Sequence, residues 1–123
     1  MAAADNWSHA AESYTFYLYV HIEPYLRTGA KLFTADYGLY WFNYEAGYDV
    51  LLAEFGWNHT REIQVALCRG AASAHGKDWG IIITWTYAEP PYLESAEALY
   101  DDLTMAYHSG AKYIIVFEYE IMG

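Results

Sequence analysis

Three carboxylates lie at the ends of apolar runs in the sequence: Asp36, Glu54 and Glu118. A charge beside an apolar run is costly unless it is paired or used. Glycoside hydrolysis requires two carboxylates, one as acid and one as base or nucleophile, and an apolar aromatic setting raises a carboxyl pKa toward the acid role. We therefore take all three as candidate catalytic residues. The alternative is that they cap helices or pair with Arg61 or Arg69.

Aromatic and amide side chains gather around the same strand ends. The chain has 14 Tyr, 5 Trp and 5 Phe among its 123 residues, and such rings suit sugar-stacking platforms, protein interfaces or the core. The candidate substrate-binding residues are Tyr37, Trp41, Trp57, Asn58, His59, Trp85, Tyr87 and Tyr119. Surface or capping use is the alternative for His59.

The elements that position these residues begin with a repeated phrase. The stretches RTGAKLFTADYG and HSGAKYIIVFEYE both place Gly-Ala-Lys before an apolar run that ends on an acidic residue and a tyrosine. Glycine favours a left-handed helix end, and lysine solvates the start of a strand. Gly76-Lys77 fits the same pattern. The phrase therefore predicts a helix that ends and a strand that begins.

Four apolar runs are predicted strands: Lys31 to Gly38, Val50 to Gly56, Trp79 to Thr86 and Ala111 to Glu118. The last contains IIVF without alternation, which predicts a strand covered on both faces. Two helices are predicted between them, from Thr60 to Gly76 and from Ser95 to Gly110, each with a capping residue at its start and glycine at its stop. Residues Leu39 to Asp49 are expected to form a long aromatic loop, and Asp102 to lie on the surface.

The segment from Ser13 to Thr28 is ambiguous. Its β-branched and aromatic residues favour a strand, but only eight residues would separate Ile22 from Lys31, too few for a parallel crossover. We expect a helix kinked at Pro24, with an antiparallel strand as the alternative. The chain is then one α/β domain, residues 1–123, with a parallel sheet of four strands and about three helices. Ligands of such sheets bind beyond the C-terminal strand ends, where the three carboxylates are expected.

A resemblance follows from two strings. DYGLYWFNYEAGYDVLLAEFGWN and GIIITWTYAEPPYLES resemble part of a (β/α)8 TIM-barrel glycoside hydrolase. In the large retaining clan of these enzymes, an acid/base Glu ends the fourth strand and a nucleophile Glu ends the seventh. The resemblance implies those roles for Asp36 and Glu118. Because the first residue is Asp and the Asn-Glu pair of the clan is absent there, Glu54 competes as the acid.

Four strands cannot close a barrel of about eight. We therefore expect either a fragment of a longer barrel or a half-barrel completed by a second copy as a two-fold dimer. A flavodoxin-like sheet is the monomeric alternative. Two functions remain open: a carbohydrate-active hydrolase, and a non-catalytic sugar-binding or self-assembling module derived from such a barrel.

Other functions lack sequence support. The net charge of −10 argues against nucleic acid. No metal-ligand spacing, P-loop or glycine-rich dinucleotide motif occurs, so no metal or cofactor is expected. No run reaches the length of a membrane span, and the first residues lack a secretory pattern, which makes the cytoplasm the default location. The single Cys68 is expected to be a small buried side chain.

Overall fold

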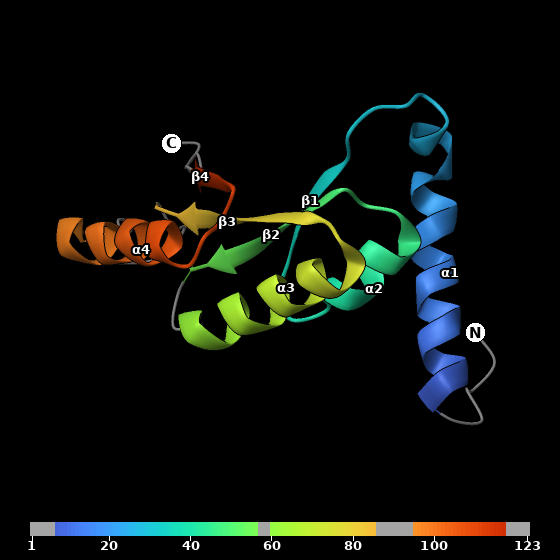
Figure 1. Ribbon diagram of the computed structural model, residues 1–123, viewed down its shortest axis with the longest axis horizontal. Helices are drawn as coiled ribbons and strands as arrows, with labels where there is room; N and C mark the ends of the chain where they lie inside the picture. The colour runs from blue at the N-terminus through green and yellow to red at the C-terminus, as the bar shows by residue number, and fades with distance from the viewer. Residues whose placement is uncertain (1–6, 57–59, 86–94, 118–123) are drawn as a thin grey trace, which may run out of the picture.

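A computed structural model describes residues 7–56, 60–85 and 95–117 of the chain. Helices and strands alternate along it (Figure 1). The helices are α1 (Trp7–Leu26), α2 (Tyr40–Ala46), α3 (Arg61–His75) and α4 (Ala96–His108). The strands are β1 (Phe33–Asp36), β2 (Val50–Phe55), β3 (Asp78–Thr84) and β4 (Tyr113–Phe117). The expected α/β fold is confirmed.

The four strands form one sheet in the order β1-β2-β3-β4, and every neighbouring pair is parallel. One face, which we call the helix-covered face, packs under α2, α3 and α4. Its side chains belong to a single buried cluster that includes Leu51, Ala53, Phe55, Ile81 and Ile83. Because helices cover only this face, the described residues do not form the doubly wound sheet of a flavodoxin-like protein.

The opposite side of the sheet, which we call the open face, has no helix over it among the described residues. Alternation along each strand assigns it Phe33, Ala35, Val50, Leu52, Glu54, Asp78, Gly80, Ile82, Thr84, Tyr113, Ile115 and Phe117. The rings of Phe33 and Tyr113 meet there with centroids 5.0 Å apart. They lie above the two strands between them, which accounts for the burial of Val50 and Leu52.

The glycine and lysine pattern has the predicted meaning. Gly29, Gly76 and Gly110 all have positive φ, and each separates a helix from the following strand. The lysines that follow form ion pairs at the N-terminal edge of the sheet. Lys31 and Lys112 lie 4.0 and 3.0 Å from Asp78, and Lys77 lies 3.7 Å from Asp49. The Lys31 ammonium also donates to the Tyr113 hydroxyl at 3.2 Å.

Two expectations about the first half of the chain need correction. The ambiguous N-terminal segment is a helix, as preferred, but α1 begins at Trp7 and Pro24 lies in its last turn. The expected loop from Leu39 to Asp49 contains α2, so the chain has four described helices. Tyr40, Asn43 and Tyr44 lie at helical spacing and are buried. Their packing stabilises a helix too short to form alone.

The expectation that IIVF is covered on both faces is wrong for a single chain. Ile114, Ile115, Val116 and Phe117 are 37–45% exposed. β4 is an edge strand, and α4 covers it on one side only in part. An uncharged apolar edge strand of this kind is unusual in a monomer.

Candidate functional site

The C-terminal strand ends meet at one edge of the sheet because all strands are parallel. Two of the three candidate carboxylates, Asp36 and Glu54, lie at this edge within the described residues. The third, Glu118, lies outside them. So do five of the predicted substrate-binding residues: Trp57, Asn58, His59, Tyr87 and Tyr119.

Asp36 points to the helix-covered face. It pairs in register with Ala53, whose side chain is in the buried cluster. One carboxylate oxygen accepts from the Tyr37 backbone N–H at 2.6 Å, and the other accepts from the Asn43 side-chain amide. Asn43 also donates to the Leu39 carbonyl at 3.0 Å. Asp36 thus holds the turn between β1 and α2 through a side chain of α2, and it does not cap the backbone of that helix.

Glu54 points to the open face. It pairs in register with Ile82, and its neighbours Ala53 and Phe55 point the other way into the core. The side chain is partly exposed. Within the described part of the chain it makes no ion pair and no side-chain hydrogen bond. Glu54 is therefore a carboxylate at the strand-end edge that is available to a ligand.

The structure does not bring Asp36 and Glu54 together, because they lie on opposite faces of the sheet. The residue offset decides this: Asp36 pairs with Ala53, one position before Glu54. A ligand would reach Asp36 from the helix-covered face and Glu54 from the open face. One ligand on a single face therefore cannot contact both carboxylates. Of the two, only Glu54 faces the side on which a closed barrel has its interior.

The described aromatic candidates occupy different places. Tyr37 follows Asp36 and is half-exposed. Trp85 lies just beyond β3, where its backbone N–H donates to the Phe117 carbonyl at 3.0 Å. Trp41 lies on α2, and its ring contacts the His75 ring at 4.4 Å between centroids. Because His75 ends α3 just before β3 begins, Trp41 reaches toward the edge opposite to the strand ends.

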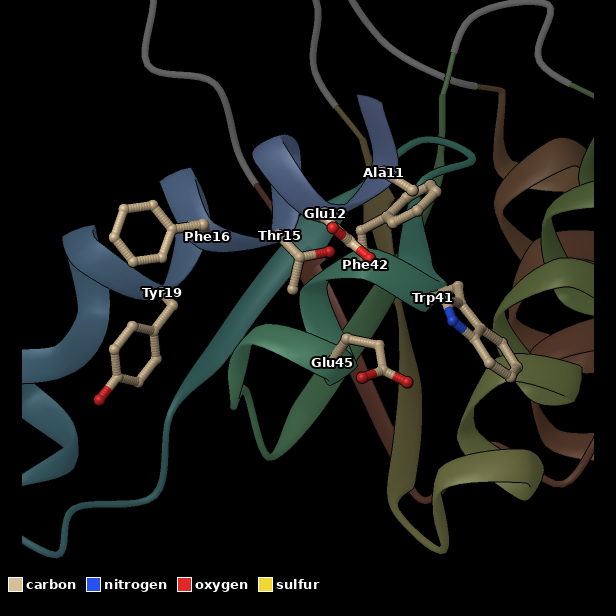
Figure 2. Close-up of a pocket in the computed structure, with 8 residues that line it drawn as sticks. All are labelled: Ala11, Glu12, Thr15, Phe16, Tyr19, Trp41, Phe42 and Glu45. Atoms are coloured by element: carbon tan, nitrogen blue, oxygen red, sulfur yellow. The ribbon is translucent and has the colours of Figure 1, made fainter. Parts of the chain in front are cut away.

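A groove of about 460 Å³ separates α1 from α2 (Figure 2). Figure 2 shows Phe16 and Tyr19 projecting from α1, and Trp41, Phe42 and Glu45 coming from α2. Glu45 is bound to His75 at 3.1 Å between Oε1 and Nε2. Sequence reasoning missed this groove because α2 was expected to be a loop. The only signal was the helical spacing of Tyr40, Asn43 and Tyr44.

A buried ion pair joins α3 to α4 close to the strand ends. Arg61 donates from Nε to Asp102 Oδ1 at 3.2 Å and from a terminal nitrogen to Oδ2 at 3.3 Å. It also donates to the Gly56 carbonyl at 3.2 Å. The expected surface position of Asp102 is wrong: the residue is 7% exposed. Arg61 thus pairs with a helix carboxylate and not with Asp36 or Glu54.

Three buried acidic groups stay neutral near pH 7. Burial raises the pKa of the Cys68 thiol to about 12, with a further contribution from Asp36. Burial also raises the pKa of Tyr40 and Tyr44 well above their ordinary range. The Tyr44 hydroxyl donates to the Asp78 carbonyl at 2.7 Å and accepts from the Leu51 N–H. A thiol with such a pKa is no nucleophile, in line with the expectation that Cys68 is a buried side chain.

The described residues contain no group of three His, Cys, Asp or Glu side chains placed to hold a metal ion. Across residues 7–56, 60–85 and 95–117, no helix has the length and apolar character that crossing a membrane requires. No family model, curated protein or solved structure matches this chain. The resemblance to glycoside hydrolases therefore stays a prediction.

Proposed function

We propose that this chain is half of a parallel (β/α) barrel and that it functions by pairing with a second copy of itself. The observation that carries the proposal is β4, whose apolar side chains are exposed on both faces of the sheet. The same positions in β2 and β3 that face the helices are fully buried. A neighbouring strand and helix from another chain would cover β4 in the same way.

The chemistry of the two edge strands supports this pairing. β4 (Tyr113–Phe117) contains no charged residue, and β1 carries only Asp36 at its end. Natural edge strands that avoid pairing usually carry charges, proline or bulges. Here Lys31 and Lys112 precede the strands, so they place no positive charge within β1 or β4. Pairing β4 of one copy with β1 of the other removes both edges in a two-fold dimer.

A ring contact across the sheet supports closure into a barrel. Neighbouring strands lie about 4.8 Å apart, so β1 and β4 would be roughly 14 Å apart in a flat sheet. The contact between Phe33 and Tyr113 across the open face requires the sheet to bend toward that face. A second copy with the same curvature would place its open face opposite the first.

Light scattering at micromolar concentration tests the assembly. The expected mass is twice the 14.1 kDa of one chain. Ile115→Lys places a charge on the exposed open face of β4 and should yield monomers. Ile63→Lys on α3 is the matched control, because Ile63 is a similarly exposed apolar residue away from both edges, and it should leave the dimer intact. A stable monomer of the unaltered chain contradicts the proposal.

Carbohydrate hydrolysis is the second candidate function, and the position of Glu54 favours it. In a two-fold dimer, Glu54 of each copy would face the same interior from opposite sides. A pair of carboxylates about 6.5–9.5 Å apart suits inversion, and a pair about 5–5.5 Å apart suits retention. The role predicted for Glu118 remains part of this candidate, whereas Asp36 points to the helix-covered face and away from the interior. Without catalysis, the same interior would bind a sugar, and the dimer would be a sugar-binding module.

A screen of aryl glycosides tests hydrolysis. Glu54→Gln should abolish turnover and leave the dimer mass and thermal stability unchanged. Glu62→Gln, on the exposed first turn of α3, is the control and should retain full turnover. Turnover that survives Glu54→Gln would contradict the catalytic role of Glu54. Sugar binding without turnover, seen by calorimetry, would favour the binding module.

A further inference from the structure

The groove between α1 and α2 is walled by aromatic rings. Phe16 and Tyr19 of α1 line one side, and Trp41 and Phe42 of α2 line the other (Figure 2). Phe16, Tyr19 and Trp41 are 67%, 43% and 48% exposed, so much of each ring is left uncovered by protein. The groove volume of about 460 Å³ falls within the range of about 300–1,000 Å³ typical of small-molecule sites. The groove is therefore large enough for a small ligand.

Each wall of the groove also carries one carboxylate. Glu12 lies four residues before Phe16 on α1, and Glu45 lies four residues after Trp41 on α2, so each carboxylate shares a helix face with an aromatic ring. Within the described part of the chain, the Glu12 side chain makes no ion pair and no hydrogen bond. The Glu45 carboxylate contacts His75 through Oε1. Both side chains thus keep carboxylate oxygens open to a ligand.

The negative charge of the groove has no basic partner among the described residues that line it. His75, which contacts Glu45, is not one of these lining residues. Five basic side chains form ion pairs with carboxylates outside the groove: Arg27, Lys31, Arg61, Lys77 and Lys112. The charge that complements the groove is therefore positive and comes from a ligand.

The α2 wall is held in place before any ligand arrives. The His75 ring lies with its centroid 4.4 Å from that of Trp41 and 5.6 Å from that of Tyr44. Its Nδ1 lies 2.8 Å from the Ala71 carbonyl oxygen, and its Nε2 lies 3.1 Å from Glu45. The carboxylate of Glu45 and the ring of Trp41 thus contact the same imidazole. A site fixed in this way loses little freedom when a ligand binds.

We infer that this groove binds a small organic cation of the quaternary ammonium class. The faces of aromatic rings attract a cation, and Glu12 and Glu45 add two negative charges. A quaternary ammonium has no N–H group to satisfy, and its alkyl groups pack against the rings. An anion is repelled by both carboxylates, and an uncharged ligand gains nothing from their charge. The site belongs to one chain and does not depend on the proposed dimer.

An NMR titration with choline tests the site. Choline should shift backbone amide signals of α1 and α2. The uncharged alcohol in which carbon replaces the quaternary nitrogen should bind at least about fivefold more weakly, because it lacks the attraction to the rings and carboxylates. Raising the ionic strength should weaken the binding of choline and not that of the alcohol. Equal affinities for the two compounds, or shifts confined to other elements, would overturn the inference.

Three substitutions assign the effect to the groove. Glu12→Gln and Phe16→Leu should each weaken choline binding by about two- to fivefold, since one removes a charge and the other removes a ring but keeps an apolar side chain. Glu62→Gln, on the first turn of α3, is the control and should leave the affinity unchanged. Equal affinity in all three variants would contradict the site. Light scattering on the same samples keeps the two proposals apart, because a monomer that binds choline supports the groove and contradicts the dimer.

Discussion

The ring of Phe33 on β1 packs edge-on against the ring of Tyr113 on β4, although β2 and β3 lie between their strands. Gly80 sits beneath this contact, paired in register with Tyr113. A Cβ atom on Gly80 would lie 2.5 Å from the Tyr113 carbonyl oxygen and 2.8 Å from a methyl group of Leu52. The absence of a side chain at Gly80 is what lets the sheet bend this far.

Gly80→Ala is therefore expected to lower the free energy of unfolding by about 1–3 kcal/mol, the usual cost of overpacking. Urea denaturation followed by circular dichroism measures it. Gly70→Ala is the control: its added methyl group meets no atom within 4 Å in the middle of α3, and helix propensity predicts a gain of about 0.5–1 kcal/mol. Equal effects of the two substitutions would contradict the close approach at Gly80.

Asp102→Asn should destabilise the fold by roughly 2–3 kcal/mol, because it leaves the guanidinium of Arg61 without its charge partner in a largely buried place. Thermal and urea unfolding both report the loss. Its neighbour Asp101 is exposed, so Asp101→Asn should change stability by less than about 0.5 kcal/mol. An Asp102→Asn protein as stable as Asp101→Asn would show that the pair contributes nothing.

Removing Asp36 should lower the free energy of unfolding more than removing Glu54. Asp36→Ala removes an acceptor of two hydrogen bonds and should cost about 1–3 kcal/mol. Glu54→Ala removes no described partner and should stay within about 0.5 kcal/mol of the unaltered chain. Comparison of their unfolding midpoints in urea checks this, and the reverse ranking would mean that Glu54 is the structural residue.

Alkaline pH should destabilise the protein. The pKa of Cys68 in the folded chain is about 12, raised from an ordinary 9.0, so the unfolded chain loses this proton first. The stabilisation is complete below pH 9 and falls between pH 9 and 12, by up to roughly 1.4 kcal/mol per pH unit. Tyr40 and Tyr44 add to the fall above pH 10.

Cys68→Ala distinguishes the contribution of the thiol to the alkaline loss of stability from that of the two tyrosines. The variant should lose the pH dependence between 9 and 10 and keep the fall above pH 10. Unfolding free energies measured at half-unit steps provide the comparison. A variant that still weakens between pH 9 and 10 as steeply as the unaltered chain would assign the effect to another group.

Salt should strengthen the proposed dimer. Each copy carries a net charge of −10, so two copies repel, while the surfaces assigned to the interface are apolar. Raising ionic strength from about 0.05 to 0.5 M shortens the screening length severalfold and should tighten association. Analytical ultracentrifugation at several salt concentrations measures the trend. Weaker association at high salt would mean that ion pairs hold the interface.

The architecture follows from local signals in the sequence. Glycine marks the helix ends at Gly76 and Gly110, and the Ser95 hydroxyl caps α4 by accepting from Ala98 at 3.0 Å. Continuous apolar runs locate β2 and β3, whose side chains toward the helices are buried. These signals act within a few residues of one another, and no distant contact overrides them.

The misplaced features all depend on contacts between distant segments. α2 forms because Tyr40 and Tyr44 pack against α3 and the sheet, which an aromatic string does not reveal. The face of Asp36 depends on a one-residue offset against β2. The burial of Asp102 depends on Arg61, which lies 41 residues away. Residue type alone carries none of this information.

The ring contact and the lysine pairs at the start of the strands have one more consequence. Phe33, Tyr113 and Lys31 obstruct the sheet's N-terminal margin on the side where a barrel lumen would run, whereas Glu54 stands near the other margin. The interior of a barrel built from such halves would be closed at the N-terminal end of the strands and open only at their C-terminal end. In the proposed dimer, a guest molecule would enter and leave through the same opening.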